Sequence, residues 1–314
     1  MGGGFTLNLF MMKRVLTILI LMIAFFSGQS QQDGQYSQYM FNHLAINPAY
    51  AGTKEWFDAT MLARRQWTFD GAPRTFALTL QGPLGKKKAG LGFQMGSESI
   101  GPKKIGSASL SYSYRIKLGP GKLAFGLRST ISNYVYDWKA ITYKDKSDPF
   151  ASLDVQGYIV PSVDFGMYYY TKSFYAGACV THLNQASLYK LSDTLNEPTL
   201  WPHFFAPVGF GIPVNDNFTI NPSVLVKYVS GAPIDFDFNC NFLIDKKLWL
   251  GAGYRLGYGV NLLASWNINE RLRMGYSYDY GLNKIGTLGK GSHEIMIGYG
   301  FNVFHAKTLT PRYL

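Results

Sequence analysis

The feature that most constrains the fold is an alternation of apolar and polar residues at every second position, repeated in segment after segment from Phe57 onward. Successive side chains of a β-strand point to opposite faces, so this period predicts strands. The clearest run carries Ile234, Phe236, Phe238, Cys240, Phe242 and Ile244 on one face and Asp235, Asp237, Asn239, Asn241 and Leu243 on the other. No helical period of 3.6 residues competes with this pattern. The chain is therefore predicted to be all-β.

Strand length and composition separate a membrane barrel from a soluble sandwich, which alternates in the same way. Each predicted strand has a long row of apolar residues on one face with aromatic residues near its ends, whereas strands of soluble proteins average about five or six residues in all. The 314-residue chain contains 22 Tyr, 22 Phe and 34 Gly, and only 16% of its residues are charged. Its mean hydropathy of -0.04 excludes a bundle of membrane helices and is expected where lipid-facing and lumen-facing residues alternate. The sequence predicts a transmembrane antiparallel β-barrel of the outer-membrane type.

The predicted wall has about fourteen strands, in keeping with the even number usual in bacterial single-chain barrels. Their ranges are 57–67, 74–81, 89–98, 104–117, 122–135, 159–171, 173–183, 203–213, 218–228, 233–244, 247–255, 259–268, 271–280 and 292–303. The three longest connections, at 136–158, 184–202 and 281–291, all follow odd-numbered strands. Because outer loops are long and periplasmic turns are short in such barrels, this pattern predicts that the long loops lie outside and both termini in the periplasm.

The N-terminus has the features of a secretory signal peptide. Lys13 and Arg14 precede an apolar run from Val15 to Phe26 that is too short for a spanning helix, and a start at Met11 or Met12 is an alternative. No cysteine follows the run, which argues against a lipoprotein. The predicted organisation is a cleaved signal peptide at 1–30, an N-terminal segment at 31–56, the barrel at 57–303 and a periplasmic tail at 304–314.

The segment at 31–56 does not alternate like a barrel wall. It is rich in aromatic and amide side chains, and Asn47 and Pro48 break any helix within it. Because exposed rings are costly in water, we expect the segment to fold into the periplasmic mouth as a partial plug, and the alternative is a disordered leader. The expected plug residues are Tyr39, Phe41, Asn42, Asn47, Pro48 and Tyr50.

Charged residues of both signs fall on the predicted lumen face. They are Arg64, Arg115, Arg128, Asp164, Asp235, Asp237, Arg255, Arg273, Asp279 and Glu294. Two interpretations stay open, which are salt-bridge networks that stiffen the wall and a selectivity lining for a transported solute. Glycines recur on the same face at even steps, as at Gly90, Gly92 and Gly96, and would leave room for bulky neighbours or a plug.

Side-chain patterns give no catalytic site, no cofactor and no metal site, so the chain is predicted not to be an enzyme. His293 and Glu294 begin like a zinc-protease motif, but Ile297 stands where the second histidine is required. The formal net charge of +11 comes from scattered Lys and Arg, which does not favour nucleic acid as a partner. Cys179 and Cys240 are predicted to point to opposite faces of the wall, which excludes a disulfide between them.

The long loops carry aromatic and apolar residues of the kind that anchor protein interfaces. The expected partner-binding residues are Trp138, Tyr143, Phe150, Tyr189 and Trp201. Leu188 is expected to be exposed beside them.

Three stretches carry a family resemblance. They are QYMFNHLAINPAYAG, RRQWTFDGAPRTFALTLQGPL, and the pair YSYDYGLNKIG and GSHEIMIGYGF. They resemble the PorP/SprF family of type IX secretion system membrane proteins, over essentially the whole mature chain. The resemblance implies an outer-membrane barrel of Bacteroidota, a Gram-negative group, that works with other type IX secretion components and, in part of the family, with gliding motility.

The same resemblance implies, as partners, secreted cell-surface adhesins with a C-terminal sorting domain. Outer-membrane lipid is expected as a partner from the predicted barrel itself. It offers no catalytic residues to carry over. The leading prediction is a non-catalytic component for protein export and surface anchoring of adhesins. The alternative is an outer-membrane channel or transporter for small or hydrophobic solutes.

Overall fold

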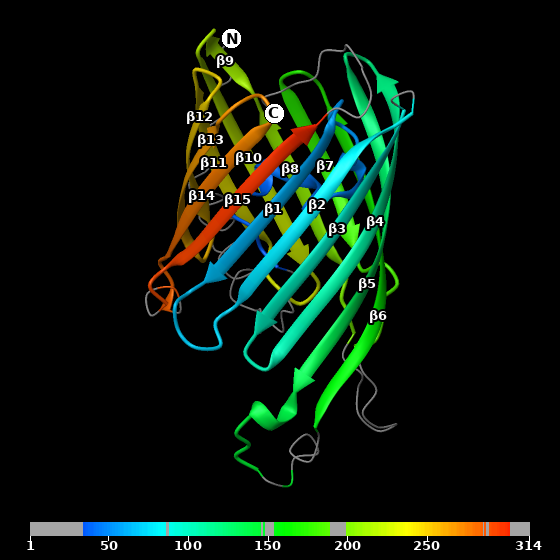
Figure 1. The fold of residues 1–314 in the computed structure, drawn as a ribbon, viewed down its shortest axis with the longest axis vertical. Coiled ribbons are helices and arrows are strands. Elements are labelled where there is room, and N and C mark those ends of the chain that lie inside the picture. Colours follow the sequence, from blue (N-terminus) through cyan, green and yellow to red (C-terminus); the bar gives the residue numbers. More distant parts are fainter. Residues whose placement is uncertain are drawn as a thin grey trace, which may run out of the picture.

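The computed structural model describes residues 34–85, 88–145, 147, 154–188, 199–284, 286 and 289–301. Over these residues the chain forms a closed antiparallel β-barrel, as predicted (Figure 1). The predicted signal peptide and C-terminal tail lie outside the described residues, as do Phe150 and Tyr189. No helix in the described part of the chain is long and apolar enough to cross a membrane.

Apart from β8 and β9, which do not pair with each other, each strand of the barrel pairs with its neighbours in the sequence. The strands are β1 (Phe57–Gln66), β2 (Arg74–Leu84), β3 (Ala89–Ile100), β4 (Lys103–Leu118), β5 (Gly121–Asp137), β6 (Val155–Tyr170), β7 (Phe174–Thr181), β8 (His203–Phe210), β9 (Ile212–Asn215), β10 (Phe218–Val229), β11 (Asp235–Ile244), β12 (Leu248–Arg255), β13 (Gly259–Asn267), β14 (Leu272–Gly281) and β15 (Ser292–Phe301). β1 pairs with β15 and β10 with β11, so the wall closes, and among the described strands the short β9 is the one that pairs on one side alone.

β8 and β9 occupy one position in the wall, because both pair with β10. They are the two parts of the strand predicted at 203–213, and the ladder is interrupted at Gly211, whose N–H donates to the Ser173 carbonyl. Counted this way, the wall has the fourteen strands that the alternation predicted.

The two faces of the wall differ in the way the alternation requires. On β4, Leu110 is 60% exposed, whereas the neighbouring Ser111 on the lumen face is 2% exposed. On β11, Phe238 is 46% exposed and Asp237 is 3% exposed. An exterior of apolar side chains around a polar interior is the arrangement that lipid selects, because hydrocarbon offers no hydrogen-bond partner to a polar group.

The long connections all lie at one end of the barrel, which we call the long-loop end, and the opposite end is the short-turn end (Figure 1). At the short-turn end Asp245 and Lys246 join β11 to β12 with positive φ angles of 50° and 57°, the backbone of a tight hairpin turn. At the long-loop end β5 and β6, of 17 and 16 residues, extend beyond the neighbouring strands (Figure 1). β6 begins at Val155, four residues before the predicted start at residue 159, so the loop before it is shorter than expected.

No disulfide joins Cys179 to Cys240, as predicted. Cys179 on β7 is 2% exposed and turns to the lumen, whereas Cys240 on β11 belongs to the opposite face of the wall, with Phe238. The alternation of side chains along each strand therefore keeps the two thiols on different sides of the sheet.

Candidate functional site

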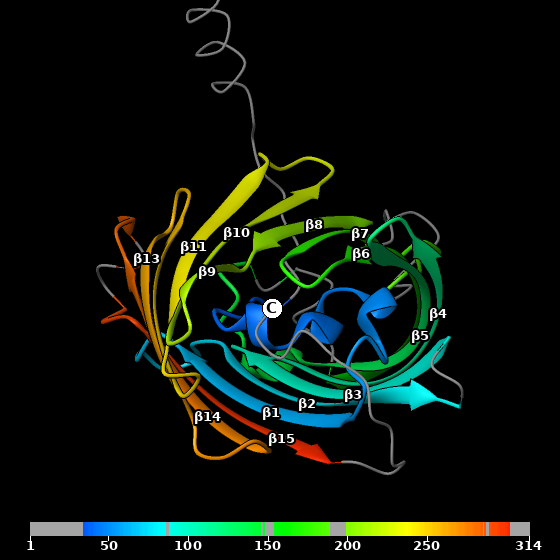
Figure 2. The same cartoon turned by 90° about the horizontal axis from the view of Figure 1, so that it is seen from above.

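The lumen contains the chain that precedes β1, which we call the lumen segment (residues 34–56). It forms three short 3-10 helices, η1 (Tyr39–Phe41), η2 (His43–Ala45) and η3 (Pro48–Tyr50), which lie inside the ring of strands (Figure 2). Gly34 lies beside Glu98, near the long-loop end of β3, and the Gly52 N–H donates to Gln81, near the short-turn end of β2 (2.8 Å). The segment therefore runs through the lumen from its long-loop half, farther than the mouth in which the sequence analysis expected it.

One side of the lumen segment lies on four glycines of the wall, Gly90, Gly92, Gly126 and Gly166, which we call the glycine bed. A Cβ on Gly126 would come within 2.2 Å of the Ala49 nitrogen, and one on Gly90 within 2.2 Å of the Ala51 carbonyl oxygen. These backbones approach so closely that no other residue type fits without displacing the segment. The even spacing of Gly90 and Gly92 was the sequence signal for this surface.

Asn47 links η3 to the wall beside the glycine bed. Its Oδ1 accepts from the Ala49 N–H (2.9 Å) and caps η3, which Pro48 begins. Its Nδ2 donates to the carbonyls of Met167 on β6 (2.9 Å) and Ala178 on β7 (3.3 Å). One side chain therefore satisfies the end of a helix and two strand carbonyls at once.

An aromatic cluster surrounds His43 in the middle of the lumen. The ring of His43 lies 4.8 Å from that of Tyr175 and 5.2 Å from that of Tyr50, and its Nδ1 is 2.9 Å from the Tyr168 hydroxyl. Burial, together with the charge of Lys54, lowers the pKa of His43 from 6.5 to about 3. His43 is therefore a neutral hydrogen-bonding group at neutral pH.

Three other expected plug residues also contact the wall. The Thr79 hydroxyl donates to Asn42 Oδ1 (3.1 Å), and Asn239 Nδ2 donates to the Tyr39 hydroxyl (2.9 Å). Phe41 packs edge to face on Trp249, with ring centroids 5.3 Å apart.

Glu294 holds the first turn of the lumen segment. Its carboxylate accepts the backbone N–H groups of Ser37 and Gln38, both at 2.8 Å. Arg64 contacts Glu294 at 3.2 Å and Asp279 at 2.6 Å, and the Ser37 hydroxyl donates to Asp279 at 2.6 Å. We call these five residues the latch, and all of its charges are buried and paired.

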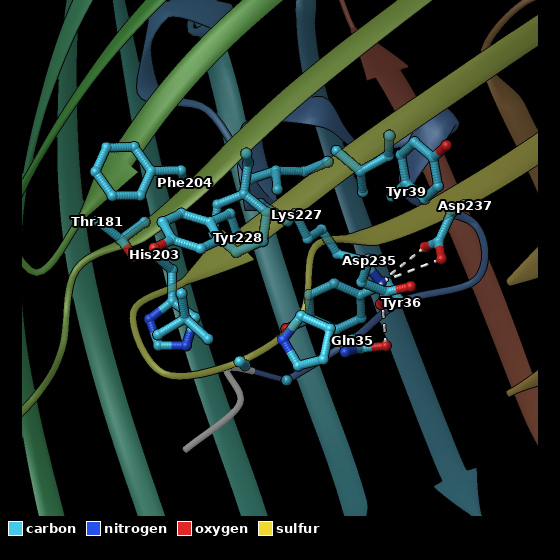
Figure 3. Close-up of a pocket in the computed structure, with 18 of the residues that line it drawn as sticks. Gln35, Tyr36, Tyr39, Thr181, His203, Phe204, Lys227, Tyr228, Asp235 and Asp237 are labelled. Atoms are coloured by element: carbon cyan, nitrogen blue, oxygen red, sulfur yellow. Dashed lines mark hydrogen bonds and ion pairs between the residues drawn. The ribbon is translucent and has the colours of Figure 1, made fainter. Parts of the chain in front are cut away.

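The other lumen charges form two further groups. Lys227 contacts Asp235 at 2.7 Å and Asp237 at 3.1 Å (Figure 3). Arg255 contacts the same Asp237 at 2.9 Å. Arg128 pairs with Asp164 at 2.5 Å. With the latch, these pairs account for eight of the ten lumen residues selected from the sequence.

The remaining two, Arg115 and Arg273, have no acidic partner within salt-bridge distance in the described part of the chain and lie against backbone. Arg115 donates to the Ala89 carbonyl (2.7 Å), close to Gly52. The Arg273 guanidinium lies 5.1 Å from the Phe41 ring centroid, over its face, and donates to the Phe41 carbonyl (3.4 Å). Both arginines therefore meet the lumen segment.

Two cavities flank the lumen segment. One of about 620 Å³ lies at the short-turn end and is lined by Met40, Phe41, Asn221, Asn241 and residues of β14. One of about 110 Å³ lies toward the long-loop end and is lined by Gln35, Tyr36, Tyr39, Lys227 and Asp237 (Figure 3). The lumen is therefore filled on the side of the glycine bed and hollow beside β10 and β11.

The loop residues selected from the sequence lie at the long-loop end with different exposures. Trp201 is 48% exposed. Trp138, which begins η4 (Trp138–Ala140), is half-buried and stacked on Tyr136 with ring centroids 5.2 Å apart, and the half-buried Tyr143 donates to its carbonyl (3.2 Å). Leu188 was expected to be exposed, and this was wrong, because it is 2% exposed in a cluster with Tyr134 and neighbouring loop residues.

Sequence reasoning missed Ser37, Gln38 and His43, which make some of the most buried contacts of the lumen segment. Their residue types are common in loops, and their partners on β6, β14 and β15 lie more than a hundred residues away in the chain. The only signal was their position in an aromatic stretch outside the barrel pattern.

A closed wall with an apolar exterior, a polar and partly filled lumen and its long loops at one end defines an outer-membrane β-barrel protein. The fold is shared with solved barrels of that class. The chain belongs to the family described as "Type IX secretion system membrane protein PorP/SprF", whose sequence profile matches residues 28–299. The family resemblance noted in the sequence is confirmed, and family and fold together point to a membrane component rather than an enzyme.

Solved structures with a similar fold include the CymD monoaromatic hydrocarbon channel, at 12% identity and a TM-score of 0.51, over 86% of this chain and 94% of that one. Omp33 of Acinetobacter baumannii is 9% identical with a TM-score of 0.46, over 80% and 99% of the two chains. A Pseudomonas aeruginosa FadL homologue is 11% identical with a TM-score of 0.45, over 82% and 94%. At these identities the likeness is one of fold. No curated protein matches the sequence.

Proposed function

We propose that this protein is a non-catalytic outer-membrane component of the type IX secretion system that binds protein partners during export or surface anchoring of cell-surface proteins. The observation that carries the proposal is the lumen segment, which fills one side of the barrel interior and separates the two cavities beside it. With the lumen occupied, the long loops and the short-turn mouth are the surfaces left for partners. Family membership supplies the secretion system to which those partners belong.

In this proposal the short-turn end faces the periplasm and the long-loop end faces the outside. The unequal connections support this orientation, because outer-membrane barrels have short periplasmic turns. Residues 1–30 serve as a cleaved signal peptide. Other secretion components meet the periplasmic mouth, and an adhesin with a C-terminal sorting domain meets the outer loops, with gliding motility as one process that such an adhesin serves.

The outer surface has a rigid base for binding. Tyr134, Val160, Leu188 and Leu200 form a buried cluster under the loops after β5 and β7. Trp201 follows Leu200 directly and is 48% exposed. A large ring fixed next to a packed cluster is a favourable anchor, because little side-chain freedom is lost when a partner covers it.

Replacing Trp201 by Ser tests the loop surface. We expect display of the exported surface protein on whole cells to fall about tenfold or more, as for loss of an interface anchor. The matched control is Phe69→Ser, which removes a ring that is 46% exposed on another loop at the same end. Normal display by the Trp201→Ser cells, with normal barrel levels in the membrane, contradicts the loop-binding role.

Trp138→Ser is the second loop variant, paired with Trp138→Phe. Trp138 stacks on Tyr136. The Ser variant removes the Trp138 ring and with it the stacking contact, whereas a Phe ring can still stack on Tyr136. We expect loss of display in the first and retention in the second. Equal display by both variants contradicts a role for this ring in partner binding.

The plug role has its own test, which is deletion of residues 31–51 behind the intact signal peptide. Removing the lumen segment joins the two cavities, so single-channel conductance in a planar bilayer should rise clearly above that of the full chain. An unchanged conductance contradicts the plug.

A further inference from the structure

The two cavities follow one another along the same two strands. The larger is lined by Asn221 of β10 and Asn241 of β11, and the smaller by Lys227 of β10 and Asp237 of β11. Only Asn239 of β11 separates Asp237 from Asn241 on this face, and it donates to the Tyr39 hydroxyl. The lumen faces of β10 from Asn221 to Lys227 and of β11 from Asp237 to Asn241 therefore form one continuous surface, which we call the strip. The chain crosses the strip at η1 and so separates the two cavities.

The contacts between the lumen segment and the wall differ before and after η1. From Asn42 to Gly52 it lies on the glycine bed, where the backbones are too close for a side chain. From Gly34 to Phe41 the contact with a wall glycine is made by a side chain, since Gln38 Oε1 lies where a Cβ on Gly275 would be. The backbone of this part is held by the latch carboxylate of Glu294, and its side chains by contacts such as Asn239 to Tyr39. We call residues 34–41 the gate and residues 42–52 the anchor.

The wall does not depend on the gate for its charge pairing. Arg64 stays with Asp279 and Glu294 whether or not Ser37 is present. Lys227 likewise keeps Asp235 and Asp237. Arg273 contacts the gate through the carbonyl and ring of Phe41, and it lines the larger cavity, where water can solvate it once the gate has left. Water can likewise replace the N–H groups of the gate at Glu294, whereas release of the anchor empties the space above four glycines.

The side chains along the strip are polar enough to hold water. Asn221 is 9% exposed and lines the larger cavity, and its Nδ2 has no hydrogen-bond partner among the residues that the structure describes. A buried amide donor without a partner is satisfied by water in a polar cavity of this size. Farther along, the charges of Lys227 and Arg255 balance those of Asp235 and Asp237, which favours neither cations nor anions.

We propose that the gate leaves the β10–β11 wall while the anchor stays on the glycine bed, and that the strip then opened conducts small hydrophilic solutes and ions with little charge selectivity. This activity goes beyond partner binding and requires no secretion partner. It is therefore measurable with the purified full chain in a planar lipid bilayer.

The first test weakens the latch in the full chain with Ser37→Ala and Glu294→Gln combined. We expect the open probability to rise at least tenfold over the unmodified protein, with a cation-to-anion permeability ratio within about threefold of one. Deletion of residues 34–41 is a second variant that does not alter the wall, and it should give a steadily open channel. Currents equal to those of the unmodified protein in the deletion variant overturn the proposal.

The second test locates the pathway by thiol labelling, in a background of Cys179→Ser and Cys240→Ser. In the latch variant, Asn221→Cys should react with a charged methanethiosulfonate and lose at least half of its current. Ile220→Cys, one position away on the lipid face, is the matched control and should keep its current.

Labelling of Ser113→Cys distinguishes movement of the gate alone from release of the whole lumen segment. Ser113 is fully buried, and its hydroxyl donates to the anchor carbonyl of Ala51 (2.5 Å). We expect it to stay unlabelled while Asn221→Cys is labelled. Labelling of Ser113→Cys at a similar rate, or no labelling of Asn221→Cys, overturns the division into gate and anchor.

Discussion

Glu294 has 0% exposure and yet carries a charge that two backbone N–H groups and one guanidinium satisfy. A buried carboxylate is tolerated only when it is paired and hydrogen-bonded, because desolvation of an isolated charge is costly. The same residue therefore joins two parts of the chain, since its partners Ser37 and Arg64 belong to the lumen segment and to β1. Single residues of this kind decide whether the segment stays docked.

Glu294→Gln should weaken docking of the lumen segment by roughly 2 kcal/mol or more. The amide keeps the shape of the carboxylate but loses its charge. Its NH₂ group also replaces one of the two oxygens that accept the Ser37 and Gln38 N–H groups, so one of these donors loses its acceptor. The measurement is the temperature at which the heat-modifiable band of the purified barrel converts in a gel. Glu270→Gln on an exposed turn is the control and should shift stability by less than about 0.5 kcal/mol. An equal effect of the two variants contradicts the role of the latch.

His43 should make docking of the lumen segment sensitive to acid. Its pKa is about 3 in the docked segment and 6.5 in a freely exposed one. Between pH 3 and pH 6.5, His43 is therefore neutral when the segment is docked and protonated when the segment is released. The His43 contribution to docking is thus constant above pH 6.5 and falls by about 1.4 kcal/mol per pH unit below it. The protection of the amides of residues 34–56, expressed relative to the intrinsic exchange rate at each pH, should fall from pH 7.5 to pH 5 and fall less in His43→Gln. The same pH dependence in both proteins contradicts this assignment.

At the scale of elements, η3 shows how a helix of three residues is held in place by its surroundings. Isolated helices this short do not form in water, since nucleation is unfavourable. Here Pro48 presets the first turn, Asn47 caps it, and Gly126 and Gly166 let it approach the sheet. The helical conformation of η3 therefore depends on its packing against the glycine bed.

Asn47→Ala should cost roughly 2 kcal/mol of docking, because the cap and two amide donors are lost. Asn47→Asp separates the two roles, since a carboxylate keeps the cap to Ala49 but faces the carbonyls of Met167 and Ala178 without a donor. We expect the Asp variant to be at least as destabilised as the Ala variant, measured by hydrogen exchange over residues 44–52. An Asp variant as protected as the unmodified protein means that the wall contacts contribute nothing.

At the scale of the whole molecule, the barrel is stabilised by closure and by its position in lipid. Pairing of β1 with β15 joins the first and last strands, so the backbone groups of both find partners within the wall. The exterior belt of apolar side chains then fixes how deeply the barrel sits. Leu110 near the middle of β4 and Leu118 at its end are both exposed, at 60% and 49%, but at different depths.

Leu110→Arg should destabilise the barrel in lipid vesicles by about 2–4 kcal/mol, and Leu118→Arg by about 1 kcal/mol or less, because the cost of a lipid-facing charge depends on depth. Urea unfolding followed by tryptophan fluorescence measures both. Equal costs at the two positions contradict the position of the bilayer inferred from the belt.

The sequence by itself determined the wall of this protein: fourteen strands, the face each turns to lipid, the end that carries the long loops and the placement of the two cysteines on opposite faces. These follow from a period of two, which is local, because neighbouring residues of a strand must point to opposite sides. The family also was readable from three stretches of sequence. Gly90 and Gly92, two of the four glycines of the bed, stood out by their even spacing on one face, whereas Gly126 and Gly166 did not.

Only the tertiary structure decided how far the lumen segment reaches, which lumen charges pair and that Leu188 is buried. Gln38 meets Glu294 across 256 positions of chain, and Asn47 meets Met167 across 120. Such contacts depend on closure of the wall, which brings distant residues to one place, and no local pattern in the sequence records which of them will meet.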